Sequence, residues 1–202
     1  MDLRDLLAGV PIRDASPDLP RDVTGAGYDS HTIQPGQVFV AIHGAAADGH
    51  DYTALARQRG AVCAISTHPV EGLPYVIVPD TRQALARIAG NFFRHPDREL
   101  HLIGVTGTNG KTSVTLLLKA VLEQTRGAKV GLIGTMGNRI GAEEIPSERT
   151  TPESLELQGL FDRMRQAGCE YAVMEVSSHA IALDRVGGVR SDVAAFTNPG
   201  HG

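Results

Sequence analysis

Several residue types and patterns that mark whole classes of protein are scarce or missing in this chain. Its 202 residues include no Trp and only two Cys, and aromatic residues make up 4% of the total. No apolar run approaches the roughly 18 residues that a membrane-spanning helix needs. Segment 1–7 carries three charged residues and no apolar core, so no signal peptide is expected. These absences argue against a membrane or secreted protein, and we expect a cytoplasmic one.

An excess of basic residues is missing as well. The net charge is −4 and the pI is about 6.0, which gives no basic footprint for nucleic acid. Cys63 and Cys169 lie far apart in apolar runs and form no C-x-x-C pair, so we expect buried free thiols. The 42% of apolar residues are mostly Val, Ile, Leu and Ala, which suit buried parallel strands and their covering helices.

Strand and helix patterns alternate along the chain, which predicts an α/β fold with parallel sheets. In the first half we expect strands at 38–42, 62–65 and 75–78 and helices at 52–58 and 82–93. In the second half we expect strands at 101–105, 129–133, 171–176 and 193–196 and helices at 112–124 and 153–166. The polar segment 94–98 contains Pro and predicts a boundary between domains 1–98 and 99–202.

The segment 104–112, Gly-Val-Thr-Gly-Thr-Asn-Gly-Lys-Thr, carries the most information. It follows an apolar run and opens a segment rich in Leu and Val, which is the order strand, phosphate loop, helix. Glycines let backbone N–H groups close around phosphate oxygens, and the helix N-terminus adds a positive dipole end. Lys111 can reach terminal phosphates, and the Thr112 hydroxyl can ligate Mg²⁺. The pattern therefore predicts binding of a nucleoside triphosphate.

One position departs from the general pattern G-x-x-x-x-G-K-[ST]. Val105 stands where the first glycine belongs, whereas Gly104 lies one residue earlier and Gly107 lies inside the loop. The alternative is a glycine-rich turn that binds nothing. The junction between a strand and a helix favours the phosphate loop.

Polar residues also follow the expected strand at 171–176. Glu175 is followed by Ser177, Ser178 and His179. A carboxylate at the end of a neighbouring strand can hold Mg²⁺, and a solvated glutamate is the alternative. The G-x-S-x-G elbow of a serine hydrolase is absent. We interpret His179 as a local hydrogen-bonding residue.

Three loops offer further polar or small residues. The loop 149–152 supplies two hydroxyls and a cation, and taken alone it predicts a helix entry with Thr151 as N-cap and Pro152 at the first helical position. Segments 28–30 and 44–49 are interpreted as turns.

Together, these pieces resemble the Mur ligases of peptidoglycan synthesis. The second half carries T-G-T-N-G-K-T, T-T-P-E-S and M-E-V-S-S-H-A, and the first half carries D-S-H, P-G-Q-V-F-V-A-I-H-G and A-D-G-H. The motifs of the second half point to the branch that adds the third amino acid. The resemblance spans 28–198. It implies a small α/β UDP-sugar-binding domain at 1–98 and the first part of a P-loop central domain with a mostly parallel sheet at 99–202.

The resemblance also implies a reaction, which is ATP-dependent amide formation. The D-glutamate carboxylate of UDP-N-acetylmuramoyl-L-alanyl-D-glutamate attacks the γ-phosphate of ATP. The amine of a diamino acid, either diaminopimelate or lysine, then attacks the acyl phosphate. The implied ligands are ATP, Mg²⁺, the UDP-linked dipeptide and the diamino acid, with no nucleic acid and no membrane insertion.

Residue roles follow from the resemblance by position. Lys111 and Glu175 would be catalytic, and Thr112 and Glu175 would hold Mg²⁺. The residues implied to cradle ATP are Gly107, Thr108, Asn109, Gly110, Lys111, Thr112 and Ser113. Those implied to contact the muramoyl-peptide or its UDP end are Ser30, Ala45, Ala46, Ala47, Thr150, Thr151, Ser177 and Arg185. His31 and Arg149 depart from the residues that the family usually has there.

The family continues beyond F-T-N into a third domain, so we expect these 202 residues to be a fragment that does not ligate alone. We also expect its incomplete second sheet to leave an unpaired edge and exposed apolar surface. Two other classes remain open. One is a folylpolyglutamate-type or cyanophycin-type ligase, and the other is a non-catalytic nucleotide-binding module.

Overall fold

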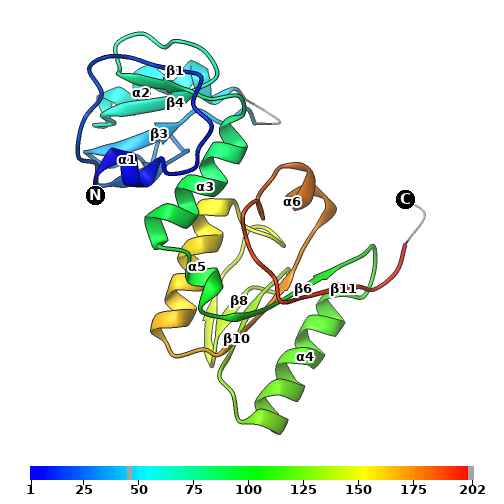
Figure 1. The fold of residues 1–202 in the computed structure, drawn as a ribbon. Coiled ribbons are helices and arrows are strands. Elements are labelled where there is room, and N and C mark those ends of the chain that lie inside the picture. Colours follow the sequence, from blue (N-terminus) through cyan, green and yellow to red (C-terminus); the bar gives the residue numbers. More distant parts are fainter. Residues whose placement is uncertain (45–46, 200–202) are drawn as a thin grey trace. The chain divides into compact units, whose positions relative to one another are not determined.

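The computed structural model describes residues 1–44 and 47–199. The chain divides into two compact units, Met1–Phe92 and Phe93–Gly202. Each unit is an α/β layer structure with its own sheet, and Figure 1 shows the elements of both. The α/β fold with mostly parallel sheets is therefore confirmed.

The first unit is built on a five-stranded sheet in the order β1-β5-β4-β3-β2. Strands β2 to β5 are parallel, and β1 runs antiparallel to β5. The strands are β1 (Asp14–Ala15), β2 (Gly25–Gly27), β3 (Gln37–Val40), β4 (Cys63–Ser66) and β5 (Tyr75–Ile77). The helices are α1 (Leu3–Leu6), the 3₁₀ helix η1 (Gly49–Tyr52), α2 (Thr53–Gln58) and α3 (Thr81–Phe93).

The core of the first unit consists mainly of aliphatic side chains packed around Phe39, as the low aromatic content predicts. One cluster joins Phe39 of β3 and Ala64 of β4 to Ala56 of α2, with Ile33 and Leu73 from the connecting loops. The apolar stripe of α3 is buried along most of the helix. The helical periodicity at 82–93 therefore reports core packing, as its spacing predicts.

The second unit has a six-stranded sheet in the order β11-β6-β10-β7-β8-β9. Strands β11, β6, β10 and β7 are parallel, and β8 and β9 extend the sheet as an antiparallel hairpin. The strands are β6 (His101–Thr106), β7 (Val130–Ile133), β8 (Asn138–Ile140), β9 (Glu143–Ile145), β10 (Tyr171–Glu175) and β11 (Val193–Phe196). The helices are η2 (Pro96–Arg98), α4 (Lys111–Arg126), α5 (Ser154–Gln166) and α6 (Ser178–Ala182).

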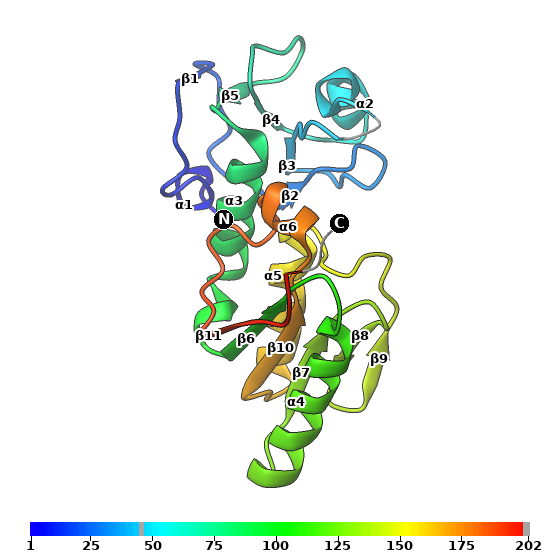
Figure 2. The same cartoon turned by 90° about the vertical axis from the view of Figure 1, so that its right-hand side faces the viewer.

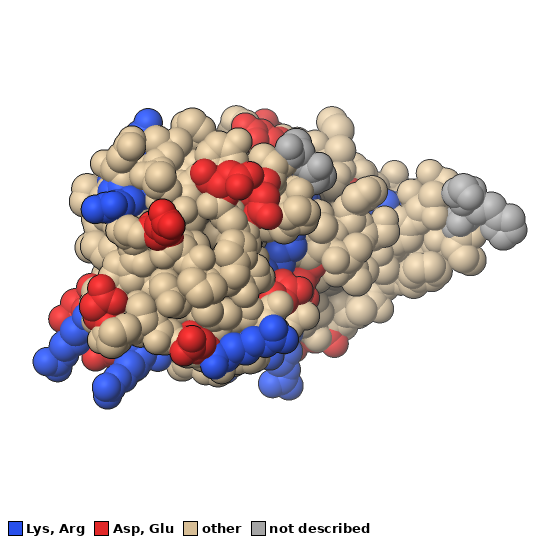
Figure 3. Space-filling model, turned by 90° about the horizontal axis from the view of Figure 1, so that it is seen from above, with Lys and Arg blue, Asp and Glu red and all other residues tan. Residues whose placement is uncertain are grey.

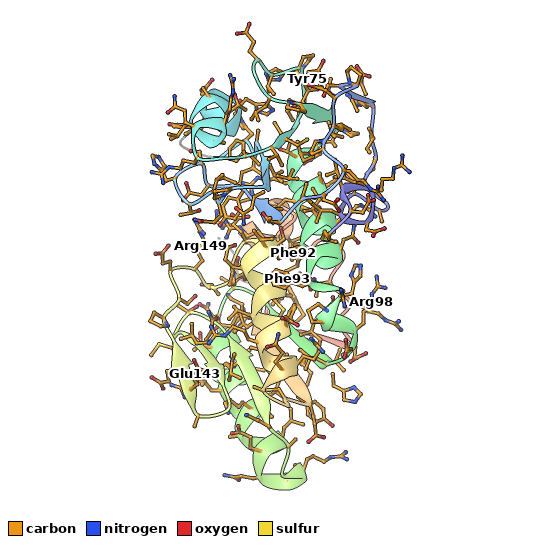
Figure 4. All side chains as sticks on the ribbon, turned by 90° about the vertical axis from the view of Figure 1, so that its left-hand side faces the viewer. Tyr75, Phe92, Phe93, Arg98, Glu143 and Arg149 are labelled. Atoms are coloured by element: carbon orange, nitrogen blue, oxygen red, sulfur yellow. The ribbon has the colours of Figure 1, made fainter. Side chains whose placement is uncertain are left out.

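Helices cover both faces of this sheet, as Figures 1 and 2 show for α4 and α5. Side chains that alternate along β6, β7 and β10 point to opposite faces. Leu102, Ile133 and Met174 pack with Phe161 of α5, whereas the adjacent strand residues Ile103, Leu132 and Val173 pack with α4. Phe93, at the end of α3, lies against α5 at Gly159 (Figure 4). Burial on both faces explains why these strands read as continuous apolar runs.

Some elements were missed by the sequence patterns. The hairpin β8–β9 and the strands β1 and β2 have two or three residues each, too few for a visible alternation. The expected helix entry at Thr151 and Pro152 is wrong: α5 begins at Ser154 with Glu153 as N-cap residue. The Thr151 hydroxyl is engaged elsewhere, as described below.

The surface charge and the environment of the two cysteines match what the composition predicts. Acidic and basic side chains are interspersed on the face drawn in Figure 3. Both Cys63 and Cys169 are free and buried, as expected, and burial raises the pKa of the Cys63 thiol to about 12. Within the described residues, no helix combines the length and hydropathy that crossing a bilayer requires.

Candidate nucleotide and substrate site

The register of the second sheet brings the predicted phosphate loop and Glu175 to one edge. In the parallel pair β6–β10, Glu175 is opposite Val105, so both strands end at the same level. The loop 107–110 follows β6 directly, and the segment 176–178 follows β10. Because ligands of parallel α/β sheets bind at the carboxyl ends of the strands, this edge is the candidate site.

The phosphate loop leads into the N-terminus of α4. Gly107 and Gly110 have φ angles of +129° and +83°, in the region that favours glycine. Gly110 precedes Lys111, the first residue of α4, and makes no side-chain cap, so the first N–H groups of the helix lie at the mouth of the loop. Lys111 Nζ donates to the carbonyl oxygens of Gly107 (2.6 Å) and Thr108 (3.3 Å). The loop thus gathers backbone N–H groups, a helix dipole and an ammonium group, which suit a polyphosphate.

The remaining predicted nucleotide residues differ in exposure. Thr108, Asn109 and Ser113 are exposed, and Thr112 is half-buried in the first turn of α4. These positions leave the loop open to a ligand.

Glu175 lies in a set of polar side chains that we call the carboxylate cluster: Thr135, Thr150, Thr151, Glu153, Glu175, Ser177 and Arg185. The side chain of Glu175 is buried, with 2% of the residue exposed. Thr135 holds both of its oxygens: the backbone N–H donates to Oε1 and the hydroxyl to Oε2, each at 3.1 Å. Thr135 Oγ1 also lies 2.9 Å from Thr150 Oγ1. Thr135 therefore links the carboxylate to the loop before α5.

Thr151 ties the same loop to the end of β10. Its hydroxyl donates to the Glu175 carbonyl oxygen (2.8 Å) and accepts from the Ser177 N–H (3.1 Å). This use of the hydroxyl explains why Thr151 does not cap α5. Ser177 is the N-cap residue of α6, and its Oγ accepts from the N–H of Ala180 (3.1 Å). The loops after β10 and before α5 are thus fixed to each other.

Arg185 completes the carboxylate cluster. Its Nε lies 2.9 Å from Glu153 Oε1, and one Nη donates to the Thr151 carbonyl oxygen (3.2 Å). Both side chains are largely buried, at 14% and 6% exposure. A buried arginine needs such a partner, because an unpaired charge is costly to remove from water. Arg149, on the preceding loop, is exposed (Figure 4).

The site residues predicted in the first unit lie on its loops. Ser30 is buried and Ala47 is exposed. Ala45 and Ala46 lie outside the described residues.

Beside this segment, Asp48 accepts from His50, with Oδ1 2.5 Å from His50 Nδ1, and its Oδ2 lies 3.2 Å from His43 Nδ1. His50 Nε2 in turn accepts from the Thr67 N–H (3.0 Å). The His50 backbone N–H, together with the imidazole groups of His50 and His43, holds the pKa of Asp48 below its usual range. The turn that contains the motif A-D-G-H, residues 47–50, is therefore held in place by these contacts of Asp48 and His50.

The donors at the edge of the second sheet fit Mg²⁺, which prefers oxygen ligands and keeps several waters or phosphate oxygens. The Glu175 carboxylate and the Thr112 hydroxyl are hard oxygen donors on neighbouring segments. Among residues 1–44 and 47–199, no group of three or more His, Cys, Asp and Glu side chains could hold a metal ion.

Several contributing residues were missed by the sequence patterns. Thr135 and Glu153 support the carboxylate cluster, and Thr197 and Asn198 hydrogen-bond to the phosphate loop. Each acts through long-range contacts that a single sequence does not reveal. The sequence indicates them only by position, because each lies shortly after an expected strand or next to a motif.

Comparison with known proteins places both halves in one family. The model of the Mur ligase family catalytic domain matches residues 22–93, and that of the Mur ligase middle domain matches residues 105–201. A relative from Caldanaerobacter subterraneus subsp. tengcongensis, named UDP-N-acetylmuramoyl-L-alanyl-D-glutamate–2,6-diaminopimelate ligase, is 48% identical over 98% of this chain and 41% of its own length. A relative of the same name from Geobacillus thermodenitrificans is 46% identical over 88% of this chain and 36% of its own length. The chain thus spans about two fifths of these relatives.

Solved structures of Mur ligases have a fold similar to that of this chain. A structure of a ligase with that name superposes with a TM-score of 0.82 at 25% identity, covering 100% of this chain and 41% of the other. The MurF ligase of Thermotoga maritima in complex with ADP gives a TM-score of 0.52 at 25% identity, covering 76% and 32%. With two family models covering most of its residues and a matching fold, the chain belongs to the Mur ligase family.

Proposed function

We propose that this chain forms the UDP-sugar-binding domain and the first part of the ATP-binding domain of a 2,6-diaminopimelate ligase. The reaction would join diaminopimelate to UDP-N-acetylmuramoyl-L-alanyl-D-glutamate through an acyl phosphate. One observation carries the proposal: the phosphate loop and a buried carboxylate lie at the ends of the neighbouring strands β6 and β10. The names of the relatives support diaminopimelate, rather than lysine, as the diamino acid.

In this proposal the phosphate loop binds the ATP triphosphate. Lys111 would leave the carbonyl oxygens of Gly107 and Thr108 and place its ammonium against the γ-phosphate. There it would offset the negative charge that develops during phosphoryl transfer. The N-terminus of α4 would add backbone N–H groups directed at the same oxygens. Thr112 and Glu175 would hold Mg²⁺, which supplies charge neutralisation between the phosphates.

The carboxylate cluster would receive the muramoyl-peptide. Thr150, Thr151, Ser177 and Arg185 occupy the positions that the family motifs assign to this substrate. Arg185 supplies a guanidinium beside a buried loop, and this group suits a peptide carboxylate. Ser30 and the segment 45–47 would bind the UDP end. The use of ATP and the two buried thiols support action in the cytoplasm.

Ligand binding tests this proposal with the 202-residue chain itself. We expect MgADP to bind and the Lys111→Ala variant to bind it at least about tenfold more weakly, since a charge-assisted contact is lost. Lys129→Ala is the matched control, because the Lys129 ammonium donates to the Ala167 carbonyl oxygen, far from the loop in sequence. Equal affinity of wild type and Lys111→Ala for MgADP would contradict the assignment.

A thermal shift separates the candidate substrate classes. UDP-N-acetylmuramoyl-L-alanyl-D-glutamate should raise the melting temperature of the first unit, since a ligand that binds only the folded state stabilises it. A folate should leave it unchanged. Stabilisation by the folate alone would instead favour a folylpolyglutamate-type ligase, and stabilisation by nucleotides alone would favour a nucleotide-binding module.

A further inference from the structure

Thr197, directly after β11, is hydrogen-bonded to the turn that follows β6. Its backbone N–H donates to the Thr106 carbonyl oxygen at 2.9 Å. Its hydroxyl, which has a single proton, lies 2.6 Å from the Asn109 carbonyl oxygen, to which it donates, and 3.3 Å from the Thr106 carbonyl oxygen. Thr197 therefore contacts the phosphate loop at both of its ends.

Asn198 binds the middle of the same loop with its backbone and its side chain. Its carbonyl oxygen accepts from the Thr108 N–H (3.3 Å), and its Oδ1 accepts from the Asn109 N–H (3.1 Å). Its Nδ2 lies 3.4 Å from the Asn109 carbonyl oxygen, which it approaches as a second donor. The Asn198 side chain thus pairs with both backbone groups of Asn109.

We propose that Thr197 and Asn198, which we call the loop clamp, are positioning residues that hold the phosphate loop open for a nucleotide. This inference rests on the proposed function for the identity of the ligand. Every contact of the clamp is made by protein groups alone, so none of them requires a phosphate. Preorganised N–H groups bind an anion better, because the cost of ordering the loop is met during folding.

The loop clamp also selects which N–H groups face the phosphates. It accepts hydrogen bonds from the N–H groups of Thr108 and Asn109, so these two N–H groups cannot bind phosphate oxygens while the clamp is formed. A trans peptide group is planar, and its C=O and N–H point in opposite directions. Because the Asn109 C=O is turned to the clamp, the N–H of Gly110 in the same peptide group points away from it. The Gly110 N–H and the first N–H groups of α4 therefore remain available to bind phosphate oxygens.

Gly107 fits this interpretation. A Cβ atom at this position would overlap Thr197 Oγ1 and lie 3.1 Å from the backbone nitrogens of Thr197 and Asn198. Glycine is required here because Thr197 and Asn198 approach closely, in addition to the φ angle of +129°. This explains a glycine at a position where the general phosphate-loop pattern accepts any residue.

Amide hydrogen exchange and nucleotide affinity test the loop clamp in the 202-residue chain. For Thr197→Val and Asn198→Ala without nucleotide, we expect the Asn109 amide to exchange about tenfold faster. We expect the affinity for MgADP to fall about three- to tenfold in each variant, the effect of one or two net hydrogen bonds. Thr197→Ser keeps the hydroxyl and should restore both values.

Matched controls keep the two variants interpretable. Thr125→Val removes a hydroxyl that bonds to the Val121 carbonyl oxygen within α4. Asn91→Ala removes an amide that bonds to the Leu6 and Ala8 carbonyl oxygens in the first unit. Neither should change the exchange of the loop. Unchanged exchange of β6 and β10 amides shows that the clamp variants are folded.

The outcomes separate this inference from the proposed function. If Thr197→Val and Asn198→Ala exchange and bind MgADP as the wild type does, the loop clamp is wrong. If they lose affinity but Thr197→Ser is equally weak, the hydroxyl is not the cause and the inference also fails. If the wild type binds no nucleotide, the proposed function fails, and the exchange rates still decide whether the clamp orders the loop.

Discussion

The two halves of the candidate site are built in opposite ways. The phosphate loop is exposed at Thr108, Asn109 and Gly110 and is held from one side by the loop clamp. The carboxylate cluster has a buried centre, formed by Thr151, Glu153 and Glu175, and its loops are hydrogen-bonded to one another. Under the proposed function, a triphosphate has to enter a loop of N–H groups, so the loop must be open. A carboxylate that holds an ion is more effective when its orientation is fixed in advance. Burial thus marks the part of the site whose side chains are held by other protein groups.

The largest difference between the two halves should appear when the buried ion pair is broken. Arg185→Ala leaves Glu153 buried without its guanidinium partner, so we expect the free energy of unfolding of the second unit to fall by about 3 kcal/mol. Urea denaturation followed by probes in this unit measures it. The matched control is Arg163→Ala, which breaks the exposed pair with Glu143, the residue labelled in Figure 4.

That control should cost less than about 1 kcal/mol, because solvent screens an exposed pair. Adding Glu153→Gln to Arg185→Ala should restore part of the stability, since the uncompensated charge is then gone. Equal losses for Arg185→Ala and Arg163→Ala would show that burial does not distinguish this pair.

A smaller effect is expected at Gly134, which lies beside the carboxylate. A Cβ atom there would overlap Glu175 Oε1 and lie 3.0 Å from its Cδ. We expect Gly134→Ala to push Glu175 away from Thr135 and to lower the free energy of unfolding by about 1–3 kcal/mol. The comparison is Gly104→Ala in β6, where the added atom would make an ordinary contact with Val176 at 3.4 Å.

Chemical shifts of the Thr135 amide provide a second measurement for this pair of variants. They should change in Gly134→Ala and stay the same in Gly104→Ala. If Gly104→Ala is the more destabilising variant, the space between Gly134 and Glu175 accommodates a methyl group and the prediction is wrong.

The smallest effect should come from Asp48, a partly exposed carboxylate that contrasts with the buried Glu175. Hydrogen bonds from His50 lower the pKa of Asp48 below its ordinary value of 3.8. The stabilisation is therefore fully present above about pH 4 and is lost as the pH falls toward the lowered pKa. We expect a contribution below about 1 kcal/mol, because Asp48 is only partly shielded from water.

Melting temperatures of wild type and Asp48→Asn from pH 6 to pH 2 measure this contribution. The difference between them should shrink below pH 4, since Asn does not titrate. A difference that stays constant with pH would exclude the carboxylate charge as its source.

The sequence predicts the parts of this molecule that depend on local pattern. The periodicity of 82–93, the apolar run 101–105 and the glycines before Lys111 identify α3, β6 and the phosphate loop within one or two residues. Contacts between distant segments are a different matter. Nothing local reveals that Thr135 holds Glu175 across 40 positions, or that Asn198 reaches Asn109 across 89.

The same limit explains the error at Thr151. Its sequence fits an N-cap, yet its hydroxyl bonds to the end of β10, which only the folded sheet brings close. The assigned roles of the site residues remain predictions for the binding experiments described above.

The position of β11 has a practical consequence. This strand lies at the end of the sheet order, and the apolar side chains of Val193 and Phe196 are 52% and 65% exposed. Such an edge can recruit a strand from another molecule. Because β11 leads directly into Thr197 and Asn198, self-association at this edge would also alter the shape of the nucleotide cradle. Measured nucleotide affinity would then vary with protein concentration, so titrations repeated over a dilution series are needed to report the binding of a single molecule.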